Sequence, residues 1–464
     1  MTQPQNVVQP HVRRACGDGD SVVTEAMRVI FAGAALGVLA CAGCASMHGA
    51  PTTADVDAAI RGRAATGIRL EGNAALPPGA DLADGVTQEE AVAIALWNSP
   101  SFQATLVDLG IARADLAEAG LLRNPIFSLL FPVGPKQLEF TLQYPFDALI
   151  QRPARVAAAR FNARVIGERL VWDALTLVAE VKTAHADAVI ADRRLALAAE
   201  HATLARRLAD ITDARLRAGD ISDLDARAPR SDAARSDLVR RALQHDRDLA
   251  RLTLAAVLGV DRLPEQLPVQ VSVAYDLAPC AVDDARLADA LASRPDVRAA
   301  EIGVEAAAGK ARWERSRAVA LIAVLDANGK GEDGFEMGPG IGLDIPLFNR
   351  NQGGVGRATA EIERASRLYL AARTRVIAEV RSAAIRVSQA RQALDVWTAE
   401  IVPSLEIEQR QAESAYTAGE IPLFTVLDVS RRLVEGRLRQ LDAQSDLFRA
   451  RIALDRAIGR SCKG

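Results

Sequence analysis

The sequence has few aromatic residues, which makes a conventional globular core difficult to build. Of its 464 residues only 4% are Phe, Trp or Tyr, whereas 25% are charged. Ala, Arg, Leu and Asp dominate the second half, a mixture that favours long helices packed closely through small side chains. The net charge of −3 leaves no basic surplus for nucleic acid and no acidic tail typical of disorder.

The usual motifs of catalysis and metal binding are also missing. The chain has five cysteines and five histidines, but their spacing does not resemble a structural zinc site. No GxSxG nucleophile and no P-loop occur, and the glycine-rich run at 338–342 falls in an expected strand instead of opening a helix. We therefore expect no enzymatic activity, no catalytic residue, no cofactor and no bound metal, so any energy must come from a partner.

An apolar run near the N-terminus is typical of a targeting signal. Met27-Arg28 precede the uncharged residues 29–40, which are too few to span a bilayer as a helix. Small residues then surround Cys41 and Cys44, as in a bacterial lipoprotein signal whose cysteine is lipidated. Because residues 1–26 do not resemble the start of a signal, either Met1 or Met27 is the true start.

Two cysteines compete for the lipid anchor. Cys44 follows Ala42-Gly43, the more typical pair, whereas Cys41 follows 38–40, an acceptable lipobox. A plain signal peptide with incidental cysteines is the alternative. The remaining sequence has no apolar run long enough for a membrane helix, so a membrane-spanning form of this chain would have to be a β-barrel.

An internal duplication of about 200 residues organises the chain. Ala218-Gly219-Asp220-Ile221 recurs as Ala418-Gly419-Glu420-Ile421, and residues 142–146 match 343–348. The segments expected from this repeat are an extension with signal (1–44), an extended segment (45–86), a first repeat (87–260), a linker (261–282), a second repeat (283–460) and a tail (461–464).

Each repeat is expected to contain a helix, two strands, a long helix and a returning helix. Thr87 and Glu90 form a capping box for a helix that runs to about Arg123. The long helices are predicted at 154–217, about 95 Å at ~1.5 Å per residue, and at 355–417, where Pro403 should produce a kink. The strands are predicted at 126–133, 137–144, 318–328 and 337–346.

The returning helices show coiled-coil spacing. In the first repeat the seam is Leu238, Ala242, His245, Leu249, Leu252 and Ala256. In the second it is Leu427, Val434, Leu438, Leu441, Ser445, Phe448 and Ile452.

The predicted fold class is mainly α with a small β part. Four strands cannot close a barrel, and open edges are not tolerated in lipid. Three copies would supply a 12-stranded β-barrel and an α-helical tunnel. Side chains should alternate between lipid and lumen, with Phe127, Leu129 and Phe131 on one face and Ser128, Leu130 and Pro132 on the other.

The chain resembles the TolC-like outer-membrane efflux family over roughly residues 85–460. The motifs that carry the resemblance are Ala415-Tyr416-Thr417-Ala418-Gly419, followed by Val426-Leu427-Asp428. It implies a homotrimer in the outer membrane, extending into the periplasm, lipid-anchored, and working with a periplasmic adaptor and an inner-membrane efflux pump of the resistance–nodulation–division class, in the heavy-metal branch. A periplasmic coiled-coil scaffold or adaptor lipoprotein without a channel is the alternative.

The resemblance also implies roles for residues near the two helix reversals. Chain reversal favours positive φ and therefore glycine, and the turns with Gly219, Asp220, Gly419 and Glu420 would contact the adaptor. Family members place two acidic residues one helical turn apart at a constriction. Here Asp428 matches one position and Thr425 occupies the other, while Asp223 and Asp225 lie at the corresponding depth of the first repeat.

Overall fold

The computed structural model describes residues 49–69, 76–78, 85–131, 133, 138–260, 282–329 and 335–461. All of these belong to one compact unit, Gly49–Gly464. The predicted anchors Cys41 and Cys44, the linker up to residue 281 and most of both hairpin turns lie outside the described residues.

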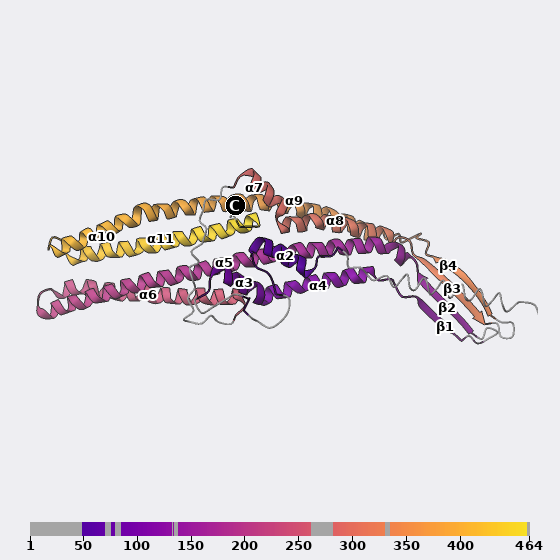
Figure 1. Ribbon diagram of the computed structural model, residues 1–464, viewed down its shortest axis with the longest axis horizontal. Helices are drawn as coiled ribbons and strands as arrows, with labels where there is room; N and C mark the ends of the chain where they lie inside the picture. The colour runs from indigo at the N-terminus through magenta and orange to yellow at the C-terminus, as the bar shows by residue number, and fades with distance from the viewer. Residues whose placement is uncertain are drawn as a thin grey trace, which may run out of the picture. The chain divides into compact units, whose positions relative to one another are not determined.

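The described chain is mainly helical with one small sheet, as predicted (Figure 1). The first half contains, in chain order, α2 (Thr53–Ala64), α3 (Gln88–Asn98), α4 (Pro100–Gly120), β1 (Ile126–Leu130), β2 (Leu138–Pro145), α5 (Asp147–Ala218) and α6 (Asp223–Leu258). The second half contains α7 (Asp284–Ser293), α8 (Pro295–Ser316), β3 (Leu321–Gly329), β4 (Phe335–Leu343), α9 (Gln352–Val396), the π-helical segment η2 (Trp397–Ile401), α10 (Val402–Thr417) and α11 (Leu423–Ile458).

The predicted first helix is in fact two helices. Thr87 and Glu90 form the expected capping box, in which Thr87 Oγ1 accepts from the Glu90 amide at 3.2 Å. The helix breaks at Ser99, whose ψ of 114° is not helical. The cause is Pro100, which disfavours helical geometry in the residue before it and starts α4 instead. The prediction of one helix to Arg123 was therefore wrong, because α4 ends at Gly120.

The long helix α5 starts earlier than predicted. It contains 72 residues and includes Pro153, which the prediction had placed just outside the helix. Ala148 and Gln151 are buried on the N-terminal side of the proline. Their packing outweighs the single backbone hydrogen bond that Pro153 cannot donate. Gly219 ends the helix with a φ of 84°.

The interruption at Pro403 is a π-helical segment. The helix α9 runs into η2, Trp397–Ile401, before α10 begins at Val402. A proline ring clashes with the carbonyl four residues earlier, here Ala399, and the wider π-helical turn accommodates it. The interruption lies where it was expected, and it takes the form of a widened π-helical turn.

The two coiled-coil seams have different environments. In α11 the seam is buried or half-buried, with Phe448 and Ile452 packed against Ile190 of α5. In α6 the predicted seam faces outward, since Leu238 is 68% and Leu249 62% exposed. The predicted seam of α6 is therefore not buried within the described chain. The buried side chains of α6 are Ala226, Pro229, Ala233, Ser236, Leu254, Ala255 and Leu258.

The four strands form one antiparallel sheet in the order β1-β2-β3-β4. The central pair joins the two halves, because β2 of the first half pairs with β3 of the second, with Leu142 opposite Leu325. The outer edges of β1 and β4 have no neighbour within the described chain. Figure 1 shows the sheet at one end of this unit and the α5–α6 and α10–α11 reversals at the other.

A buried arginine connects the helices of both halves. The Arg294 side chain is 0% exposed and forms ion pairs at 2.8 Å with Asp296 and Glu379. It also donates to the Ala457 carbonyl at 2.8 Å. Its guanidinium lies 4.4 Å from the ring centroid of Trp172, which belongs to α5 of the first half. This single side chain therefore ties α5, α8, α9 and α11 together.

Candidate functional site

The sheet has one apolar face and one polar face. The register places Leu129, Phe140, Ala327 and Met337 in one row across the four strands. Paired residues share a face and successive residues alternate. The apolar face therefore contains Phe127, Leu129, Leu138, Phe140, Leu142, Tyr144, Leu321, Ala323, Leu325, Ala327, Met337, Pro339, Ile341 and Leu343.

The described strands have three charged side chains, Glu139, Asp326 and Glu336. All three are acidic, and all three lie on the opposite face. Glu139, Asn328 and Glu336 form one row of the register. In the next row Thr141 Oγ1 donates to Asp326 at 2.8 Å. The predicted alternation of Phe127 and Leu129 against Ser128 and Leu130 agrees with this register. Phe131 lies beyond β1, and Pro132 is outside the described residues.

The two helix reversals have the same backbone geometry. Gly219 has φ 84° and Gly419 has φ 78°, so both adopt the left-handed conformation expected of them. The amides of Asp220 and Glu420 close the turns by donating to Arg215 and Ala415 carbonyls at 3.0 and 2.9 Å. Both turns are exposed, which leaves the Asp220 and Glu420 side chains on the surface.

One contact joins the ends of the two helical hairpins. Arg215 Nη1, near the end of α5, donates to the Tyr416 hydroxyl of α10 at 3.5 Å. Closer to the middle of the helices, Arg449 of α11 pairs with Asp187 of α5 at 2.8 Å. The hairpin ends are thus held by a long hydrogen bond, whereas their middle is held by an ion pair and apolar packing.

The predicted constriction residues lie together on α11, but the acidic one is paired. Thr425 and Asp428 are half-buried and one helical turn apart. Asp428 forms ion pairs with Arg431 and, at 3.3 Å, with Arg432. Sequence reasoning missed both arginines, although spacings of three and four residues on a helix signal such pairs. The Asp428 carboxylate is therefore accompanied by two positive charges.

The acidic residues at the corresponding depth of the first half are also engaged. Asp225 completes a capping box with Ser222, and the hydroxyl and amide of Ser222 lower the pKa of the Asp225 carboxyl. Asp223 pairs with Arg227 at 2.8 Å and lies 3.6 Å from Arg230. Both carboxylates thus stabilise the start of α6.

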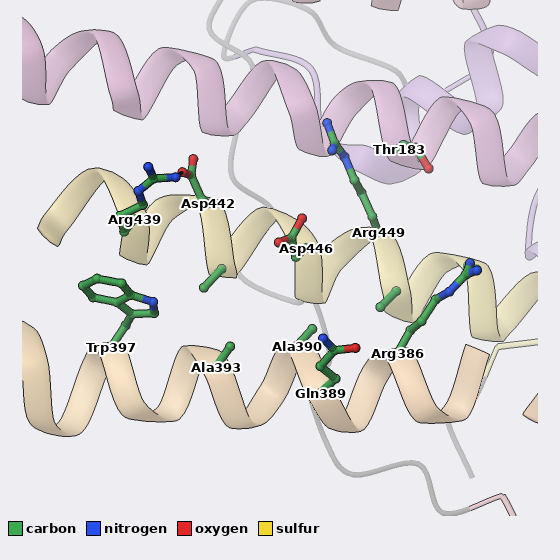
Figure 2. A pocket seen from close by; sticks show the side chains of 13 residues that line it. Thr183, Arg386, Gln389, Ala390, Ala393, Trp397, Arg439, Asp442, Asp446 and Arg449 are labelled. Atoms are coloured by element: carbon green, nitrogen blue, oxygen red, sulfur yellow. Dashed lines mark ion pairs between the residues drawn. The ribbon is translucent and has the colours of Figure 1, made fainter. Parts of the chain in front are cut away.

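A charged groove of about 620 Å³ lies where α9, α11 and α5 approach one another (Figure 2). Trp397 and the side chains of Arg439 and Asp442 line it, and the last two lie 3.6 Å apart. Asp442 also contacts Arg194 of α5. Arg449, which also lines the groove, pairs with Asp187 of α5.

The described ranges contain neither a metal-ligand cluster nor a membrane-spanning helix. In this part of the chain, no three His, Cys, Asp or Glu side chains cluster as metal ligands would. Among the described helices, none combines the length and apolarity needed to cross a membrane.

Comparison with known proteins shows similarity to outer membrane efflux proteins. The family model described as "Outer membrane efflux protein" matches residues 287–460. The cobalt-zinc-cadmium resistance protein CzcC of Cupriavidus metallidurans is 25% identical over 385 residues, which cover 82% of this chain and 91% of CzcC. The pyoverdine export outer membrane protein OpmQ of Pseudomonas putida is 27% identical over 295 residues, 61% of this chain and 62% of OpmQ.

Solved structures agree on the fold. CusC, a protein whose crystal structures describe transmembrane channel formation, superposes with a TM-score of 0.67 at 18% identity, covering 85% of this chain and 97% of CusC. The chain is therefore similar in sequence to outer membrane efflux proteins, and it shares the fold of solved channel proteins such as CusC.

Proposed function

We propose that the chain is the outer-membrane exit duct of a tripartite efflux system. In this system an inner-membrane pump supplies the energy, and a periplasmic adaptor connects the pump to the duct. The observation that carries the proposal is the four-stranded sheet, which exposes large apolar side chains such as Phe127 and Ile341 and leaves two edges unpaired within the described chain. Neither feature is stable in water or in lipid unless further strands and a bilayer cover it.

Three copies would satisfy both edges at once. Within the chain, β2 of the first half pairs with β3 of the second. The duplication makes β4 equivalent to β2 and β1 equivalent to β3, so β4 of one copy would pair with β1 of the next. Three copies of four strands close a 12-stranded barrel, with the apolar face toward lipid and Glu139, Asp326 and Glu336 toward the lumen. The outward seam of α6 would pack against helices of a neighbouring copy.

Disulfide crosslinking tests this arrangement. Leu142 pairs with Leu325 inside the chain, and the duplication therefore places Leu343 of one copy opposite Phe131 of the next. The variant with Phe131→Cys and Leu343→Cys should form crosslinked trimers in the outer membrane. Ser128→Cys with Leu343→Cys is the control, because Ser128 lies on the other face. A soluble, uncrosslinked monomer would instead support a periplasmic scaffold.

The substrates we infer are cations, including divalent metal ions. CzcC is named for cobalt, zinc and cadmium resistance, and the charged side chains on the polar sheet face are all acidic in the described strands. Deletion of the gene should raise sensitivity to these three ions, and restoration of the wild-type gene should reverse it. Unchanged tolerance of all three ions would contradict the substrate class and leave the duct itself intact.

Asp428 and Thr425 would form the constriction in a trimer. Three copies of Asp428 would surround one axis, each beside Arg431 and Arg432. Asp428→Ala should release these arginines and lower cation selectivity in single-channel recordings. Asp237→Ala is the matched control, because its carboxylate pairs with Arg240 and Arg241 at the same spacings along α6. Equal selectivity in Asp428→Ala and wild type would remove Asp428 from the gate.

The turns with Gly219, Asp220, Gly419 and Glu420 would be the adaptor-contacting tips. The double charge reversal Asp220→Lys with Glu420→Lys should weaken co-purification with the adaptor encoded beside the gene. Glu363→Lys, an exposed charge reversal on α9, should leave this co-purification unchanged.

The lipid anchor is proposed at Cys44 or Cys41, and mass spectrometry of the mature N-terminal peptide identifies which cysteine carries lipid.

A further inference from the structure

Large apolar side chains are exposed where the strands meet the helices, and they occur at matching places in both halves. In the first half, Ile150 near the start of α5 is 61% exposed. In the second half, Leu347 is 65% and Phe348 92% exposed between β4 and α9. These positions lie next to the sheet, since β2 ends at Pro145 and β4, which carries Leu343 of the apolar face, ends at that residue.

Arginines accompany these apolar side chains, and they bond to main-chain carbonyls. Arg152 Nε donates to the Gly120 carbonyl at 2.7 Å, and Arg350 Nε donates to the Pro346 carbonyl at 3.1 Å. Arg155 donates to Ala119 and Leu121 carbonyls at 2.8 and 2.6 Å. A carbonyl fixes a guanidinium without neutralising it, so each of these side chains keeps its positive charge.

The positive charge is concentrated in the first half. Burial lowers the pKa of Arg155, and repulsion from Arg123 and Arg152 lowers it further, although Glu118 acts in the opposite direction. The Arg155 guanidinium is therefore close enough to those of Arg123 and Arg152 to be repelled by both. An anion at this place would relieve the repulsion.

We propose that the two strand-to-helix junctions, one with Ile150, Arg152 and Arg155 and the other with Leu347, Phe348 and Arg350, form a junction surface that binds anionic phospholipid headgroups. The apolar side chains would enter the boundary of the acyl chains, and the guanidinium groups would bind the phosphates. The inference rests on the proposed outer-membrane location. It adds that the chain selects its lipid neighbours at the edge of the membrane nearest the helices.

Two observations favour lipid over a second copy of the chain as the occupant of this surface. They are its positive charge and its place next to the sheet. A neighbouring copy would need acidic residues facing these arginines. The acidic residues of the strands lie instead on the opposite face of the sheet. A role limited to capping α4 would explain the carbonyl contacts of Arg152 and Arg155, but it would not explain Arg350 or the exposed Phe348.

The test uses the full chain solubilised in detergent and also inserted into vesicles. Dioleoylphosphatidylglycerol and, in parallel, dioleoylphosphatidylethanolamine are titrated into the detergent-solubilised chain, and native mass spectrometry measures the bound lipid. The test variant combines Arg152→Gln with Arg350→Gln. The matched control is Arg410→Gln, because Arg410 is also exposed and donates to a main-chain carbonyl, that of Glu406 at 3.2 Å.

We expect the wild type to prefer phosphatidylglycerol, and the double variant to lose about fivefold of that preference per arginine removed. The control should keep the full preference. Equal preference in the double variant and the wild type overturns the inference, as does an equal loss in the control. Loss of the proposed trimer with an unchanged lipid preference would assign the surface to a neighbouring copy and also overturn it.

Insertion separates this inference from the proposed function. If the wild-type chain enters no vesicle of phosphatidylethanolamine, with or without phosphatidylglycerol, the proposed outer-membrane channel fails and this inference fails with it. If the chain inserts and conducts but binds both lipids equally, only the inference fails.

Discussion

Replacing Arg294 by Met should destabilise the chain more than any other single change among its ion pairs. The Arg294 side chain is 0% exposed, yet it is held by two carboxylates, one carbonyl and one indole ring. Burial disfavours its charge, but Asp296 and Glu379 outweigh burial and raise the pKa of Arg294. The side chain is therefore fully charged, and its partners depend on it.

The size of the effect follows from what is left behind. Removing one partner of a buried ion pair costs about 3–5 kcal/mol, because the remaining charge is buried without compensation. Asp296 is only 15% exposed and would bear most of this cost, whereas Glu379 is 42% exposed and can regain water. Adding Asp296→Asn to Arg294→Met should therefore restore part of the lost stability. Arg294→Lys keeps the charge but loses the two-pronged contact with Asp296, so its loss should be smaller.

Chemical unfolding of the detergent-solubilised chain, followed by Trp fluorescence, measures these differences. Arg298→Met is the matched control four residues along the same helix. Arg298 is 44% exposed and pairs with Glu168 at 3.0 Å, so its loss should cost about 0–1 kcal/mol. The reasoning is refuted if Arg294→Met and Arg298→Met lower the free energy of unfolding by the same amount.

Three further predictions concern a buried histidine and the helix ends. Burial lowers the pKa of His185, although its 2.9 Å hydrogen bond to the Val86 carbonyl opposes the shift. The histidine of the unfolded chain therefore binds a proton more readily than that of the folded chain. The free energy of unfolding should fall as pH drops below about 6.5. His185→Gln should remove that dependence between pH 7.5 and 5.5, and an unchanged slope would contradict it. Ser222→Ala removes the capping box of α6 and should cost about 1 kcal/mol in the same assay. Gly219→Ala and Gly419→Ala should each cost about 1–2 kcal/mol through positive φ alone, because a Cβ there meets nothing within 4 Å; no loss in either would show that the turns readjust.

Local chemistry made much of the fold predictable from the sequence. The glycines at 219 and 419, the capping box at Thr87 and the proline at 403 each act on the backbone next to them, so their consequences needed no tertiary information. The alternation of side chains along the strands was equally predictable from nearby residues, because only one set of alternate side chains in a strand could be apolar throughout. The duplication then extended each prediction from one half to the other.

What the sequence left hidden depends on neighbours in space. Packing of Ala148 and Gln151 kept α5 helical through Pro153, which local propensity could not indicate. Arg294 resembles any surface arginine until Glu379 and the Ala457 carbonyl are brought to it from other helices. Asp428 is the opposite case, because its partners Arg431 and Arg432 were visible at helical spacing and were overlooked.

The outward seam of α6 connects the sequence pattern to assembly. A regular alternation of three and four residues specifies a packing surface whether the partner lies in the same chain or another. In α11 that partner is α5, and Phe448 is buried against it. In α6 the same kind of pattern leaves Leu238, Leu249 and Leu252 exposed at 68%, 62% and 53%. Within one chain, the contacts between the first and second halves form one kind of junction. In the trimer that we propose, the edges of β1 and β4 and the exposed α6 seam would form a second kind, in which the first half of one copy meets the second half of the next.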